Sequence, residues 1–209
     1  MSYILDNPAI VFGLLLEHLW ITSAALVVAF VIALPLGVVA ARFRRFGALL
    51  VGALGVLYTI PSLALIIFLV PIFGLNARSV IVALIVYAQI ILVRNITAGL
   101  QAVDAAVLDV ARGMGMSAWQ RWRRVQWPLA LPVVLAGVRL AAIVCIGIAT
   151  IGAKFSAGGL GRLLFDGIAQ TERYDKIWAG AIAIAALAFT ANWALGRAER
   201  VSGAHRTIV

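Results

Sequence analysis

The sequence predicts an all-α integral membrane protein with about five transmembrane helices, its N-terminus outside and its C-terminus inside. Hydrophobic residues make up 64% of the 209 residues and charged residues only 12%. An average soluble domain is about one quarter charged, so this chain has too few charges to cover a water-soluble surface. Five apolar runs also approach or exceed the roughly 20 residues that a membrane-spanning helix needs.

The predicted spans form one transmembrane domain over residues 1–209. Arginines bound several of them: Arg42 follows the first, Arg94 ends the third and Arg197 follows the fifth. Residues 10–16 are apolar but too few to cross a bilayer, so they predict an interfacial helix or an outer extension of the first span. The spans are expected at about residues 19–41, 46–74, 79–94, 130–151 and 177–195.

The second apolar run contains Pro61 and could form one kinked span or two short ones. Lys and Arg are enriched in cytoplasmic loops, and both the 42–45 cluster and the loop 95–128 are basic. An even number of crossings between them is then required, which favours one span kinked at Pro61. The resulting inner side carries eleven arginines against three acids, and the outer side five bases against five acids, including Glu172. The inner arginines are Arg42, Arg44, Arg45, Arg94, Arg112, Arg121, Arg123, Arg124, Arg197, Arg200 and Arg206.

The motifs that are missing argue against an enzyme. Neither Lys154 nor Lys176 follows a glycine, so the chain has no Gly-Lys-Ser/Thr phosphate loop and must draw energy from another chain or an ion gradient. Gly158–Gly161 follows no strand and predicts a turn before an outer helix over 160–170. We expect no catalytic residue, no metal ligand and no bound cofactor. The chain also lacks a basic, aromatic soluble face for nucleic acid.

The segment 104–139 carries the most information about function. Asp109–Gly113 continues a helix, Gly115 permits a turn, and Met116–Arg124 can form a short helix with Ser117 as its N-cap, stopped by Pro128. This helix would either dock on a partner protein or lie on anionic membrane lipid. The side chains expected to project into the cytoplasm are Trp119, Arg121, Trp122, Arg123 and Arg124.

The spacing within this loop resembles the EAA loop of type I ABC importers. Asp109-Val110-Ala111 is followed after three residues by Gly115, after nine more by Val125, and after one more by Trp127-Pro128. Ala111, Gly115 and Pro128 match the family pattern, whereas Trp127 replaces its usual leucine. The resemblance implies the type I ABC importer transmembrane fold and favours docking on an ATPase over the lipid alternative. The implied ATPase-coupling residues are Asp109, Ala111, Gly115, Ser117, Trp119, Arg121, Trp122, Val125 and Pro128.

Longer stretches look like the permeases for osmoprotectants. They are His18–Gly37, Tyr58–Asn76, Ala111–Gln120, Pro128–Ala141 and Ser156–Gly161. This resemblance implies import of a quaternary amine or compatible solute, such as glycine betaine, choline or carnitine, across the plasma membrane. Two alternatives stay open: the same kind of importer carrying an amino acid or another small polar solute, and a membrane scaffold without transport activity.

The resemblance also implies the partners. Two ABC ATPase subunits would use ATP and Mg²⁺, while this chain binds neither. A second permease copy or a paralogue would complete the path, because five helices are too few to form it. An extracytoplasmic binding protein would deliver the substrate and set most of its specificity.

Two features inside the predicted spans each allow more than one interpretation. Arg139 is a charged residue in an apolar run, where charges are costly and often functional. We favour a structural role, in which it snorkels or pairs with a loop acid such as Asp104 or Asp109.

The other feature is the Pro61 region. Tyr58, Thr59 and Ser62 flank Pro61. Broken helices often line transport paths, so these residues either line a substrate pathway or form an ordinary proline kink.

Overall fold

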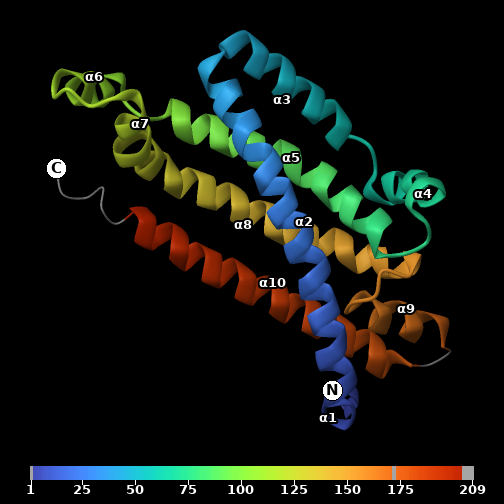
Figure 1. The fold of residues 1–209 in the computed structure, drawn as a ribbon. Helices are drawn as coiled ribbons and strands as arrows, with labels where there is room; N and C mark the ends of the chain where they lie inside the picture. Colours follow the sequence, from blue (N-terminus) through green and yellow to red (C-terminus); the bar gives the residue numbers. More distant parts are fainter. Residues whose placement is uncertain (1, 171–172, 204–209) are drawn as a thin grey trace.

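The computed structural model describes residues 2–170 and 173–203, and every regular element in this part of the chain is a helix (Figure 1). Glu172 and Arg206, which the charge balance counts, lie outside the described residues. The elements are α1 (Ser2–Asp6), α2 (Pro8–Arg42), α3 (Arg44–Tyr58), α4 (Ser62–Phe73), α5 (Ala77–Gln101), α6 (Ala105–Gly113), α7 (Ala118–Arg121), the π-helical turn η1 (Trp122–Gln126), α8 (Trp127–Gly152), the 3₁₀ turn η2 (Ala153–Phe155), α9 (Gly161–Ala169) and α10 (Tyr174–Gly203).

Helix α2 contains the predicted first span and residues 10–16, which extend it without a break. Its buried face is a row of small residues, Ala25, Ala29, Ala33 and Gly37, spaced four apart. Small side chains let helix backbones approach closely in a bilayer, where the hydrophobic effect drives no helix association. The approach is close at Gly37, where an added Cβ would lie 2.6 Å from Ile96 of α5.

Polar side chains in the same interface bond to backbone carbonyl groups. The side-chain amide of Gln89 donates to the Ala29 carbonyl at 3.1 Å, and the Thr97 hydroxyl donates to the Gly37 carbonyl at 3.3 Å. Both donors lie on α5 and are buried. These bonds fix the register of α5 against α2, because a slip would strand polar groups in an apolar environment.

The predicted single kinked helix over 46–74 is wrong in one respect. The chain does break at Pro61, but it forms two helices, α3 and α4, whose axes differ by 89°. A proline cannot donate a helical hydrogen bond and restricts the residue before it, and here three residues leave the helical path.

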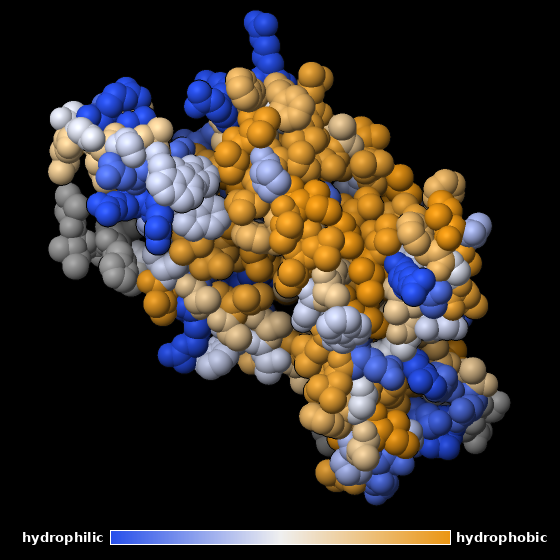
Figure 2. All heavy atoms as spheres, in the orientation of Figure 1, coloured by the Kyte–Doolittle hydropathy of each residue, from blue (hydrophilic) through white to orange (hydrophobic). Residues whose placement is uncertain are grey.

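Within the described residues, four helical segments are long and apolar enough to cross a membrane: α2, α5, the segment Ala118–Phe155 that contains α8, and α10. The bent pair α3 and α4 adds a fifth crossing if it counts as one span. Figure 2 shows a broad apolar surface with hydrophilic atoms gathered at two opposite ends. The α2–α3 junction, α6, α7 and the end of α10 meet at one end, while α1, α4 and α9 lie at the other (Figure 1). The two basic segments therefore share one end of the molecule.

The remaining spans are longer than predicted. Helix α5 contains 79–94 and runs on to Gln101, α8 contains 130–151, and α10 contains 177–195. The segment 95–128, expected as a polar loop, is mostly helical because α6, α7 and η1 lie within it. Helix α9 corresponds to the helix predicted over 160–170.

Candidate functional site

The turn at Gly115 joins α6 to α7 and has all the bonds of a helix C-cap. Gly115 has φ +77°, a left-handed conformation that strains any residue with a Cβ. Its N–H donates to the Arg112 carbonyl at 3.0 Å, and the Met116 N–H donates to the Ala111 carbonyl at 3.2 Å. This pair of bonds is the Schellman arrangement, which satisfies the last carbonyl groups of α6. Ala111, beneath the turn, is buried.

Helix α7 begins immediately with a capping box. The Ser117 hydroxyl accepts from the Gln120 N–H at 3.3 Å, and the Gln120 side chain accepts from the Ser117 N–H at 2.8 Å. Arg121 then donates to the Met116 carbonyl at 2.8 Å and ties the turn to the helix. The predicted N-cap at Ser117 is therefore correct, and the corner between the two helices is held from both sides.

Pro128 does not stop the short helix, which corrects the sequence prediction. The chain stays helical from Ala118 through η1 into α8, and Pro128 lies in the first turn of α8. In the wide turn η1 the Trp127 N–H donates to the Trp122 carbonyl, five residues back. A normal α-turn would press the Pro128 ring against the carbonyl four residues earlier, and the wider turn relieves this clash. Helices α7 and α8 are therefore joined by a continuous helical path.

The aromatic residues of this segment do not all face outward as predicted. Trp119 is exposed. Trp122 is half-buried against the core, and its ring packs at a tilt against Trp127 with ring centroids 5.8 Å apart. Val125 is also half-buried, whereas Arg123 and Arg124 are exposed.

The sequence interpretation missed two exposed apolar residues, one within α6 and one immediately after it. Val110 and Met114 are 64% and 76% exposed, at the charged end of the molecule. Val110 was noted only for its place in the EAA pattern, although an apolar residue on a polar loop is itself a signal of contact with a partner. We name the exposed residues Val110, Met114 and Trp119 the docking patch. Asp109 pairs with Arg112 at 3.0 Å on the same exposed helix.

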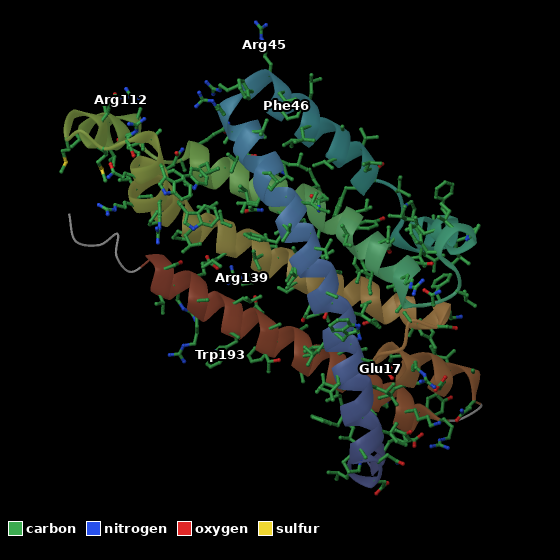
Figure 3. All side chains as sticks on the ribbon, viewed as in Figure 1. Glu17, Arg45, Phe46, Arg112, Arg139 and Trp193 are labelled. Carbon is green, nitrogen blue, oxygen red and sulfur yellow. The ribbon has the colours of Figure 1, made fainter. Side chains whose placement is uncertain are left out.

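Arg139 pairs with Glu199 of α10, not with Asp104 or Asp109 as predicted. The side chains approach to 3.3 Å and both are about 30% exposed. Arg139 lies between α8 and α10 in Figure 3, and Gly196 leaves room for it, since an added Cβ there would lie 3.1 Å from the guanidinium. The ion pair joins the middle of α8 to the C-terminal part of α10.

At the other end, Glu17 and His18 hold the loop before α9. The Glu17 carboxylate accepts from the Gly159 N–H at 2.9 Å, and the buried His18 ring bonds the Ile146 carbonyl at 3.2 Å. Gly159 has φ +80° and packs against the His18 ring. A cleft of about 480 Å³ opens beside Glu17, lined in part by Arg162, Phe165 and Asp166. No sequence pattern pointed to this arrangement, because its partners are more than 100 residues apart.

The candidate pathway residues lie together at the α3–α4 break. Tyr58 packs against Tyr87 of α5 with ring centroids 5.4 Å apart, and the Tyr87 hydroxyl donates to the Ile60 carbonyl. The Thr59 hydroxyl bonds back to the Val56 carbonyl at 2.7 Å. Ser62, which follows Pro61, begins α4. Within the described residues, no group of three or more His, Cys, Asp or Glu side chains could hold a metal ion.

The comparisons with known proteins agree with this architecture. Residues 33–200 match the family described as binding-protein-dependent transport system inner membrane component. The chain belongs to this family. As a family member it is an inner membrane component of a binding-protein-dependent transport system, and its apolar helices fit a multi-pass membrane protein.

Relatives of this inner membrane component cover nearly all of it. It is 36% identical to the osmoprotectant import permease protein OsmW of Salmonella typhimurium over 96% of this chain and 95% of that protein. It is 36% identical to the carnitine transport permease protein OpuCB of Listeria monocytogenes over 88% of this chain and 84% of that one. It is 34% identical to the glycine betaine/carnitine/choline transport system permease protein OpuCB of Bacillus subtilis over the same shares.

Among solved structures, the inner membrane component is similar to a chain of the MetNI methionine ABC transporter in an inward facing conformation. The TM-score is 0.78 at 22% identity, over 94% of this chain and 98% of that chain. The expected type I ABC importer transmembrane fold is therefore correct.

Proposed function

We propose that this chain is the permease subunit of an ATP-driven importer for quaternary amines of the glycine betaine, choline and carnitine class. The carrying observation is the similarity along nearly the whole chain to permeases named for these substrates: 36% identity over 96% of the chain in one case and 34% over 88% in another. The amino acid alternative has weaker support, because the methionine transporter shares only 22% identity.

The permease itself performs no chemistry in this proposal and binds neither ATP nor Mg²⁺. Two ABC ATPase subunits hydrolyse ATP, each docked on the segment 105–126. The supporting geometry is the braced corner at Gly115, the exposed docking patch and the unbroken helical path from α7 into α8. Rotation of the ATPases would move α7 and, through the Arg139–Glu199 pair, both α8 and α10.

A second permease copy or a paralogue completes the translocation path. In the most apolar stretch of the central helix α5, only half of the residues are buried within the chain. In the corresponding stretch of α10, 17% of the residues are buried. These surfaces face lipid or the second copy. We place the N-terminus and α9 outside and the docking patch inside, because the basic segments share one end and cytoplasmic loops are enriched in Lys and Arg. An extracytoplasmic binding protein then delivers substrate near α9.

Reconstitution into liposomes with the cognate ATPase and binding protein tests the function. We expect ATP-dependent accumulation of radiolabelled glycine betaine, choline or carnitine, and none without ATP. Accumulation of methionine or histidine with no quaternary amine would contradict the substrate class. A chain that neither co-purifies with the ATPase nor stimulates its hydrolysis would support the scaffold alternative.

The docking assignment has its own test. Met114→Glu should reduce co-purification of the ATPase about tenfold, because a charge in the centre of an apolar contact must lose its water. The matched control is Ile168→Glu, at an apolar residue of α9 that is also largely exposed and lies at the other end of the molecule. Equal co-purification by the two variants would remove the patch from the interface.

A further inference from the structure

The break between α3 and α4 leaves backbone carbonyl groups without partners inside an apolar segment. The Thr59 and Ile60 N–H groups turn back to the carbonyls of Val56 and Leu57, and the first bond of α4 goes to the Pro61 carbonyl. Among the described residues, no donor reaches the carbonyl oxygens of Tyr58 and Thr59. Lipid-exposed backbone of this kind does not occur within a bilayer, so these carbonyls must face water or protein.

The break lies deep in the predicted membrane region. At about 1.5 Å per residue, Tyr58 is roughly 20 Å along α3 from its charged start, and Tyr87 is about 15 Å along α5 from its outer end. The hydrocarbon core of a bilayer is about 30 Å thick. Both aromatic residues are therefore near the middle, where transporters with broken helices bind their substrates.

The two tyrosines have different roles at this depth. Tyr87 is 6% exposed, and its hydroxyl is held by the Ile60 carbonyl, so it forms a fixed wall. Tyr58 packs against it at an interplanar angle of 62° and is 42% exposed. The exposed part of the Tyr58 ring and the two carbonyls without donors lie within two consecutive residues, and each presents negative potential without a formal charge.

The open side of α3 continues from this surface. Gly55 and Gly52 precede Thr59 by four and seven residues, so all three share one helix face. A Cβ added at either glycine would meet nothing within 4 Å. This open helix face extends from the break toward the basic end of α3.

We propose that Tyr58, backed by Tyr87 and the carbonyls of Tyr58 and Thr59, is a transit site for the trimethylammonium headgroup of the substrate. The inference rests on the proposed function. A trimethylammonium group has no N–H to donate, so it cannot use hydrogen-bond acceptors in the usual way and binds instead to aromatic faces and carbonyl dipoles. No Asp or Glu occurs between residues 46 and 103. The absence of a carboxylate keeps the cation from being trapped, as conduction requires.

The test uses the complete transporter in liposomes and measures solute imported per ATP hydrolysed. Tyr58→Leu should lower this ratio about tenfold, while Tyr58→Phe and Tyr58→Trp should stay within about twofold of wild type. The matched control is Phe68→Leu, an exposed aromatic residue of α4 that should have no effect. Stimulation of the ATPase by loaded binding protein should persist in all four variants.

A second measurement separates a cation–π role from packing. Phenylalanine with one, two or three ring fluorines at position 58 should lower the transport ratio stepwise, because fluorine withdraws charge from the ring face with little change of shape. A flat series would overturn the transit site. If Tyr58→Leu instead disrupts the permease dimer on size-exclusion chromatography, the surface is covered by the second copy and the proposal is wrong. If wild type imports no quaternary amine, the proposed function fails first, which distinguishes the two outcomes.

Discussion

The Gly115 turn and the Pro61 break both redirect the chain between two short helices, but they treat the backbone differently. At Gly115 the carbonyls of Ala111 and Arg112 accept hydrogen bonds from the turn itself, and Ser117 and Gln120 exchange the two bonds of the capping box. At Pro61 one carbonyl is bonded by Tyr87 and two are open. The water-facing corner is therefore braced by hydrogen bonds within the chain, and its remaining backbone groups can bond to water. Such a corner is suited to pass on force, whereas the open break is suited to meet a ligand.

The largest effect expected from this comparison is at Gly115. Gly115→Pro removes the N–H that bonds Arg112 and cannot adopt φ +77°, which costs about 3 kcal/mol or more. Uptake should fall on the order of 100-fold. The measurement is initial uptake in liposomes, with quantified protein in each preparation.

Gly113 provides the matched control for that variant. It ends α6, has no positive φ, and an added Cβ would meet nothing within 4 Å. Gly113→Ala should import at the wild-type rate. Normal uptake by Gly115→Pro would show that the rigid corner is not needed and would remove its role in coupling.

The next effect is at the break. Tyr87→Phe deletes the donor to the Ile60 carbonyl and leaves a third carbonyl open, which should destabilise the protein by about 1–3 kcal/mol. Thermal unfolding in detergent would detect this as a midpoint several degrees lower. Tyr174→Phe removes the hydroxyl of an exposed tyrosine and should leave the midpoint unchanged. Equal midpoints for the two variants would mean that the break does not depend on Tyr87.

A smaller effect is expected at the α7 cap. Ser117→Ala should weaken α7 by about 1 kcal/mol, seen as roughly fivefold faster hydrogen exchange over Ala118–Arg121. Ser23→Ala, at an exposed serine of α2, is the control. Because the two bonds of a capping box support each other, Ser117→Ala with Gln120→Ala should lose less than the sum of the single losses. Full additivity would argue against the box.

The smallest effect is at the Asp109–Arg112 pair. Both side chains are 66% exposed, so the charges remain solvated and Asp109→Asn should change the free energy of unfolding by less than about 0.5 kcal/mol. Denaturation of the isolated permease measures this directly. A loss above about 1 kcal/mol would show that α6 depends on this ion pair more than on its caps.

The sequence by itself determined the elements whose cause is local. Composition and run length predicted the membrane class, because a bilayer sets the length and polarity of each span. Gly115 and Ser117 predicted the turn between α6 and α7, because a left-handed residue and an N-cap affect only the backbone within a few residues. The loop spacing from Asp109 to Pro128 was enough to indicate the family.

Tertiary structure decided everything that depended on a distant partner. It paired Arg139 with Glu199 rather than a loop acid, turned Trp122 toward the core, and placed Glu17 on Gly159. It also converted the kink at Pro61 into an 89° break backed by Tyr87. The physical reason is that a helix presents every side chain around its axis. Only packing against the other helices decides which are buried, paired or left open.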